Sequence, residues 1–312
     1  MHTTANSQLL VRQEVYSNEL KEILRDELAA MQYVNWMTDF PDGNTFTIPS
    51  IGTGDVDDYQ EDEAIVYRPL DTGEFQFTIT EYLSSGNYVT EKAMQDMFYA
   101  NQLLSKFVPE QERALMVRLE GDILKKGPDG QTAASTNLIN GEKHRFVGTG
   151  TSNTMSVEDF ARARLSLKKA NVPDTNLVAI VDPSVEYTLN TSTNLVNISN
   201  NPRWEGIVSD GIATGMKFVK NVYGFDVWTS NHLKVNAAET LESVAISGFV
   251  NNLFFSAAPG IQPIVGAWRQ MPKVDSEFDM DKQRTKFATT ARYGLALFRP
   301  ENMVVVPSYT SV

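Results

Sequence analysis

The sequence contains no cysteine among its 312 residues. This absence excludes disulfide bonds, thiolate nucleophiles and cysteine-ligated zinc or iron–sulfur sites. No run of apolar residues reaches the length of about 18 that a membrane-spanning helix requires, so we expect no membrane partner. The opening segment, MHTTANSQLL, lacks the basic flank and apolar stretch of a secretory signal. These features fit an intracellular site of synthesis.

Histidine and the usual catalytic motifs are also scarce. His2, His144 and His232 stand far apart, and none forms the paired arrangement that zinc proteases use. We expect His144 and His232 to be ordinary loop or surface residues. The sequence has no GxxxxGK[ST] phosphate loop, no GxSxG elbow and no credible dinucleotide-binding glycine motif. These absences argue against an enzyme and against a bound cofactor.

The net charge of −12 is unevenly distributed along the chain. Residues 41–90 hold ten acidic residues and one basic residue, a net charge of −9, whereas residues 92–170 hold twelve bases and nine acids, a net charge of +3. A dedicated nucleic-acid reader normally carries a strong basic surface, so the overall charge argues against that role. Non-specific contact with DNA through the segment 92–170 remains open.

The acidic segment lies between two predicted strands. Thr45–Ile48 and residues 75–82 alternate apolar and polar side chains, as strands do. Together they predict a long two-stranded arm, which can bury little of its own surface. We expect the arm to rest on a neighbouring copy of the chain. The residues expected at this self-assembly interface are Phe46, Ile48, Arg68, Phe75, Phe77 and Ile79.

The polar tip of this arm is the best candidate for a metal site. Its six carboxylates are Asp55, Asp57, Asp58, Glu61, Asp62 and Glu63. Oxygen ligands at this density can bind calcium, but their spacing is not that of an EF-hand loop. The simpler interpretation is a solvated loop whose charges repel one another. We favour this interpretation and assign no metal.

The remaining periodicities predict a mixed helix and sheet fold, of the α+β class. Helices are expected over 8–37, over about 90–124 with a kink at Pro109, over 156–169 and from 183 onward. Strands are expected at 177–181, 217–222, 225–229, 244–248, 261–265, 284–291, 294–298 and 303–306, with short ones at 138–139 and 146–147.

Four local strings and their order in the chain resemble the major capsid proteins of tailed bacteriophages with the Hong Kong 97-type fold. The strings are NTFTIPSIG (44–52), LVAIVDP (177–183), GFDVWTSNHL (224–233) and YGLALFRP (293–300). The resemblance extends over nearly the whole chain. It implies an N-terminal arm (1–44), an extended loop (45–86), a peripheral domain with a long spine helix (87–150 and 271–312) and an axial domain (151–270).

The resemblance also implies a function. It predicts hexamers and pentamers that form an icosahedral phage head around double-stranded DNA, assembled in the host cytoplasm and present in the virion. Scaffolding, portal and decoration proteins are the partners it implies. Some members of the family cross-link through a lysine in the extended loop, but this sequence has no lysine between Lys21 and Lys92. The shell is therefore expected to be held together without that bond.

Two alternatives follow from the sequence. An encapsulin-type nanocompartment shell has the same fold but encloses cargo proteins rather than a genome. A carboxylate-based hydrolase or binding module belongs to another class, and would use scattered Asp and Glu residues in a cleft of a compact monomer.

Overall fold

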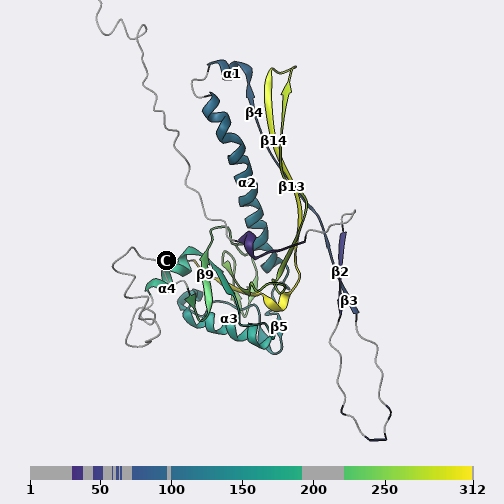
Figure 1. The fold of residues 1–312 in the computed structure, drawn as a ribbon. Coiled ribbons are helices and arrows are strands. Elements are labelled where there is room, and N and C mark those ends of the chain that lie inside the picture. The colour runs from purple at the N-terminus through teal and green to yellow at the C-terminus, as the bar shows by residue number, and fades with distance from the viewer. Residues whose placement is uncertain are drawn as a thin grey trace, which may run out of the picture.

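The computed structural model describes residues 30–37, 45–51, 58, 61–62, 64, 72–96, 100–191 and 221–310. Within these ranges the chain combines an elongated sheet, a compact sheet and a separate two-stranded hairpin (Figure 1). Most of the helix predicted over 8–37 lies outside the described residues. The mixed helix and sheet class that the sequence predicted is confirmed.

The elongated sheet has the strand order β1-β13-β14-β4. Its strands are β1 (Asn35–Met37), β13 (Ile264–Asp279), β14 (Arg284–Leu297) and β4 (Glu81–Thr90). β13 and β14 form one long antiparallel hairpin, and β4 pairs antiparallel with β14. Where the strands turn, the carboxylate of Asp279 contacts Arg284 and Lys286, and these bonds lower its pKa to about 2.

The long helix α2 (Ala100–Asp129) lies beside this sheet (Figure 1). Two of its buried polar side chains are paired with the sheet: the Tyr293 hydroxyl donates to the Asp122 carboxylate at 2.8 Å, and the Thr289 hydroxyl donates to Gln111 Oε1 at 2.9 Å. Burial and the neighbouring carboxylate raise the pKa of Tyr293 far above its usual value. No helix in the described ranges is long and apolar enough to cross a membrane.

The compact sheet has the order β15-β12-β7-β9-β8. Its strands are β15 (Val304–Ser308), β12 (Val250–Ser256), β7 (Leu177–Val181), β9 (Phe225–Thr229) and β8 (Asn221–Val222). The three strands β15, β12 and β7 are buried along their whole length. The sheet is therefore covered on both faces, which explains why β7 reads as a continuous apolar run.

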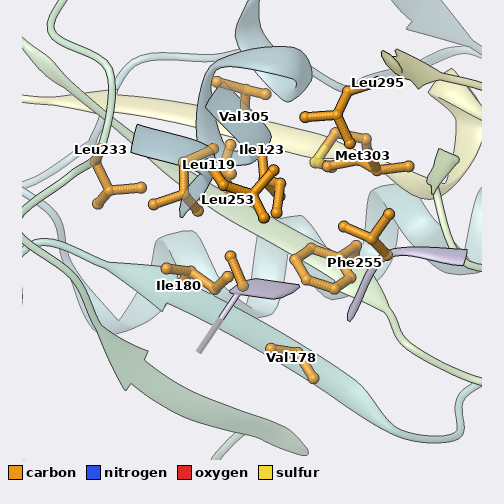
Figure 2. Close-up of a cluster of buried hydrophobic side chains, with 14 of the residues drawn as sticks. Leu119, Ile123, Val178, Ile180, Leu233, Leu253, Phe255, Leu295, Met303 and Val305 are labelled. Carbon is orange, nitrogen blue, oxygen red and sulfur yellow. The ribbon is translucent and has the colours of Figure 1, made fainter. Parts of the chain in front are cut away.

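Two apolar clusters sit on opposite faces of the compact sheet. On one face, Val178 and Ile180 pack with α2 side chains such as Leu119 and Ile123 (Figure 2). On the other face, the alternate residues of β7 pack with the helix α3 (Val157–Lys169) through Phe160. Tyr293 and Leu295 of the elongated sheet join the first cluster. The first cluster therefore joins both sheets and α2 into one body.

Two further short hairpins lie in segments that are joined by ion pairs. They are β5 (Leu138–Ile139) with β6 (Glu142–Lys143), and β10 (Thr240–Leu241) with β11 (Val244–Ala245). Arg145 contacts Glu239 through two bonds of 2.6 and 2.9 Å, and Lys143 pairs with Glu242. The bonds from Arg145 lower the pKa of the Glu239 carboxyl. These ion pairs connect segments about a hundred residues apart.

Several predicted elements are confirmed. The structure has α3 at 157–169, β7 at 177–181 and β9 at 225–229, and α4 (Pro183–Thr191) starts at the predicted proline. At the start of α3, Ser156 and Asp159 form the expected capping box.

Other predicted elements are wrong in type or extent. Residues 30–37 are a 3-10 turn, η1 (Ala30–Tyr33), followed by β1, rather than helix. The Glu120 carboxylate accepts from the Ala30 N–H, and β1 pairs with β13, so tertiary contacts override the helical spacing. The strand expected at 146–147 is absent from the described strands, and the one expected at 244–248 ends at Ala245.

The long helix and the strands around it also differ from prediction. The expected helix over 90–124 is divided into α1 (Glu91–Asp96) and α2, which runs on through Pro128 to Asp129. The two strands expected at 284–291 and 294–298 are one strand, β14. Residues 264–279 form one long strand where only 261–265 was expected, and β4 and β12 were not predicted as separate strands.

Asp159 is a fully buried carboxylate that ties α3 to the preceding loop. It accepts hydrogen bonds from the backbone N–H and hydroxyl groups of both Thr149 and Ser156, at 2.8 to 3.2 Å. We expect Asp159→Asn to lower the free energy of unfolding by about 2 kcal/mol, because an amide leaves part of this set unpaired. Urea denaturation measures this loss of unfolding free energy.

The exposed residue Glu158, next to Asp159, provides the control, since Glu158→Gln should cost less than about 0.5 kcal/mol. Equal losses in both variants would contradict this role.

The sequence analysis placed His144 in a loop or at the surface. This expectation is wrong, because the side chain is fully buried. Burial disfavours the imidazolium form and lowers the pKa of His144. The unfolded chain therefore binds this proton more readily, so stability is complete above about pH 6.5 and falls as the pH drops below it. We expect the free energy of unfolding to decrease between about pH 6.5 and 5.5, where most carboxylates stay ionised. The free energy of unfolding of the His144→Gln variant should decrease less over this interval. If the variant has the same pH dependence as the natural chain, His144 is not the group responsible.

Candidate assembly surface

The hairpin predicted as the assembly arm is present as a separate two-stranded sheet. β2 (Thr45–Ile51) pairs antiparallel with β3 (Thr72–Thr78), from Thr45↔Thr78 at the base to Ile51↔Thr72 at the far end. Figure 1 shows the hairpin leaving the body on the side away from α4. An isolated hairpin is marginally stable in water, so its base must be held by other contacts.

Those contacts involve four of the six residues predicted for the interface. Phe77 and Ile79 are 5% and 4% exposed and pack on Val265 and Ala267 of β13 in the same chain. Ile48 and Phe75 are half-buried against the same cluster, and the Phe75 ring meets Phe298 edge-to-face at 5.0 Å. These four side chains anchor the hairpin to its own subunit. Their predicted contact with a neighbouring copy stays a prediction.

The structure places the other two predicted interface residues less completely. Phe46 pairs with Phe77 in the backbone ladder, but its side chain is outside the described residues. Arg68 lies wholly outside them. Their participation in an interface stays a prediction.

The acidic tip is described only in part. Asp58, Glu61 and Asp62 are exposed, whereas Asp55, Asp57 and Glu63 lie outside the described residues. Asp62 has a positive φ of 76°, a backbone conformation in which Asp is enriched. No group of three metal-ligating side chains occurs among the residues that can be described. The placed carboxylates thus have the solvent exposure expected of a charged loop.

The segment before the hairpin is anchored on the opposite face of the elongated sheet. Trp36 stacks on Trp268 of β13 with ring centroids 4.9 Å apart, and Tyr33 meets Phe255 edge-to-face at 5.6 Å. Burial raises the pKa of the Tyr33 hydroxyl to about 12. This segment is therefore anchored to the body on the face opposite to that of Phe77 and Ile79.

The elongated sheet carries exposed apolar side chains that the sequence did not single out. Tyr82 and Tyr88 of β4 are 62% and 60% exposed, and Met271 of β13 is 70% exposed. Tyr82 and Tyr88 lie six residues apart in one strand, so they share a face of the sheet. The signal in the sequence was the pair of tyrosines, Tyr82 and Tyr88, on either side of the small and polar run Ser84 to Asn87.

The basic segment 92–170 is partly neutralised within the chain. Lys125 lies 3.7 Å from the carboxylate of Asp122, and Arg164 and Lys168 both contact Asp174. The bond from Arg164 lowers the pKa of the Asp174 carboxyl. Because Asp174 lies outside the segment, its pairs with Arg164 and Lys168 reduce the positive field of the segment below its net charge of +3.

The comparison with solved structures finds phage capsids over almost the full length of the chain. The capsid structure of cyanophage P-SCSP1u has a TM-score of 0.77 at 16% identity, covering 99% of this chain and 96% of that chain. The cyanophage Pam1 capsid has a TM-score of 0.74 at 13% identity, covering 99% of both chains. The mature capsid of bacteriophage PhiM1 has a TM-score of 0.70 at 11% identity, covering 98% and 94%.

Sequence comparison alone finds no relative. No protein-family model matches the chain, and no curated protein matches it. The likeness is therefore one of fold. The chain has the fold found in these phage capsid structures, from its first described strand to its last.

The anchoring of the hairpin leads to a stability prediction. Phe77→Ala should lower the free energy of unfolding by about 3 kcal/mol, because it leaves a cavity between the hairpin and β13. Chemical denaturation of the unassembled chain measures this loss. Gln76→Ala is the matched control: its side chain is exposed on the next residue of the same strand, and it should cost less than about 0.5 kcal/mol. A Phe77→Ala chain as stable as the Gln76→Ala chain would show that the anchor is not formed.

Proposed function

We propose that this chain is the major capsid protein of a tailed bacteriophage, with a Hong Kong 97-type fold. Its copies would form hexamers and pentamers of an icosahedral head that encloses double-stranded DNA. The observation that carries this proposal is the match to the cyanophage P-SCSP1u capsid over 99% of this chain and 96% of that chain. A match that is complete in both directions relates whole subunits and not only a shared domain.

The architecture supports a division of the chain into the four parts that the resemblance implies. We assign the N-terminal arm to 1–44, the extended loop to 45–86 and the axial domain to 151–270. The peripheral domain comprises 87–150 and 271–312, with α2 as the spine helix. The sheet pairing favours one amendment: β15 belongs with β12 and β7, so residues 304–308 join the axial domain.

The exposed surface suits repeated contacts between copies. A hairpin that projects from the body adds contact area that a compact subunit lacks, and stable contacts generally need more than about 1,000 Å². The tyrosines of β4 add an aromatic surface of the kind enriched at interfaces. Contacts between different faces of successive copies close into rings, which is how hexamers and pentamers form.

The proposal includes partners and a location. The subunit would act in the virion after assembly in the host cytoplasm, with separate scaffolding, portal and decoration proteins. The absence of lysine between Lys21 and Lys92 means that contacts through the extended loop are non-covalent. The remaining bases of segment 92–170 would make non-specific contacts with packaged DNA.

The test shortens the extended loop but keeps the paired strands β2 and β3 and their packing on the body. Because Ile51 and Thr72 are directly paired, residues 52–71 can be replaced by Asn-Gly in a tight turn. We expect this variant to remain folded by circular dichroism, because the packing of Phe77 and Ile79 is kept, and to form no closed shells by electron microscopy. The charge control Asp58→Asn, Glu61→Gln, Asp62→Asn keeps the length and should still assemble.

The outcomes separate the candidate functions. Shells of normal size from the shortened chain would refute the role of the hairpin. Shells of the natural chain that contain protein cargo and no nuclease-protected DNA would indicate an encapsulin-type compartment. A stable monomer that never assembles, alone or with its partner proteins, would overturn the capsid assignment and favour a carboxylate-based enzyme or binding module.

A further inference from the structure

The junction between the hairpin and the elongated sheet is only two residues long. β3 ends at Thr78 and β4 begins at Glu81, so Ile79 and Thr80 alone connect them. The ladder between β4 and β14 ends at the pair Glu81↔Tyr293. The next residue of β14 is Gly294, and the connection passes directly over it.

Gly294 is in contact with the backbone of this connection. A Cβ atom on Gly294 would lie 3.0 Å from Ile79 Cα, 3.1 Å from Ile79 Cγ1 and 3.2 Å from the Thr78 carbonyl oxygen. All three distances are shorter than ordinary van der Waals contact between such atoms. Two of the three atoms belong to the main chain, so no side-chain rotation can relieve the contact. Any side chain at this position must move the connection itself.

The connection has little freedom to move except away from the sheet. The Ile79 side chain is 4% exposed and packs with Val265 and Ala267 on the same face. Ala267 is the direct partner of Gly294 in the β13–β14 ladder. The sheet therefore presents only a hydrogen atom at Gly294 and a methyl group at Ala267 beneath the junction. These small residues let the chain approach closely before it turns into the hairpin.

Two other glycines of the same sheet provide contrasts. Gly86, in β4, would meet nothing closer than the Phe287 carbonyl oxygen at 3.7 Å, which is ordinary contact. Gly266, in β13, would meet the Trp36 ring at 2.7 Å, and this ring packs on the opposite face from the hairpin. Of these three glycines, Gly294 alone is in close contact with the backbone that leads to the hairpin.

We propose that Gly294 is a positioning residue that sets the direction in which the hairpin leaves the subunit, and thereby the geometry of the assembled particle. The second part rests on the proposed capsid function, whereas the first is a property of the single chain. A displacement at the junction is amplified along the hairpin, because each strand residue adds about 3.4 Å of length beyond the pivot. A small residue at one position thus controls where the far end of the hairpin lies.

The experiment measures the direction of the hairpin within one chain. Because the chain has no cysteine, Glu74→Cys on the hairpin and Glu158→Cys on α3 give two unique labelling sites, both exposed. Spin labels at these sites report the distance between hairpin and body by pulsed electron paramagnetic resonance. Labelled chain is diluted with an excess of unlabelled chain, so that only distances within one subunit contribute.

We expect Gly294→Ala to shift the mean label distance by about 2 Å or to broaden its distribution, given a pivot some five strand residues away. Gly86→Ala should leave the distribution unchanged. Gly266→Ala should lower the unfolding temperature but leave the hairpin direction as it is, which separates a loss of stability from a reorientation. In particles viewed by electron microscopy, Gly294→Ala should lose closed shells of natural diameter, and Gly86→Ala should retain them.

Each result decides the proposal. An unchanged distance distribution in folded Gly294→Ala chains overturns it, whatever the particles look like. A shifted distribution with normal shells refutes only the link to particle geometry and leaves the proposed function intact. If Gly294→Ala does not fold, Ile79→Ala replaces it. That variant keeps the glycine and removes the side chain that packs the junction on Val265 and Ala267. It must therefore broaden the distance distribution. An unchanged distance distribution overturns the proposal.

Discussion

The structure depends on one apolar contact, between the second half of α2 and both sheets. Leu119 and Ile123 of the helix pack with Tyr293 of the elongated sheet and with Leu253 and Val305 of the compact sheet. Burial of aliphatic and aromatic side chains is the main favourable term in folding. Because one cluster collects residues from three separate parts of the chain, the elongated sheet is supported along its helix-facing side. The body can then carry a hairpin that would be only marginally stable by itself.

The hairpin is anchored through one of its two faces. The apolar side chains at the base of the hairpin are used within the subunit, where Phe77 and Ile79 are buried. The alternate positions of the same strands, such as Glu74 and Gln76, are exposed. Since successive side chains of a strand point to opposite faces, β3 can pack on its own subunit with one face and leave the other face exposed.

The sequence predicted what local rules determine, and missed what distant contacts determine. The capping box of Ser156 and Asp159 marks the start of α3 correctly, and the apolar run of β7 could be read directly. β12 was missed because Asn251 and Asn252 interrupt its apolar pattern, although both are fully buried; Asn252, for example, donates to Val306 O and Ser308 Oγ in β15. The hairpin was predicted as an assembly arm, but the burial of its aromatic side chains against its own subunit has no local signal.

The connection of two residues between β3 and β4 has a mechanical consequence. In Figure 1, the hairpin and β4 extend in opposite directions from this junction. A pull on the hairpin therefore acts along the axis of β4, which is bonded to β14 from Glu81 to Thr90. Such a load shears the whole ladder at once and does not open it one bond at a time. The subunit therefore resists a load on the hairpin through the combined strength of the ladder between β4 and β14.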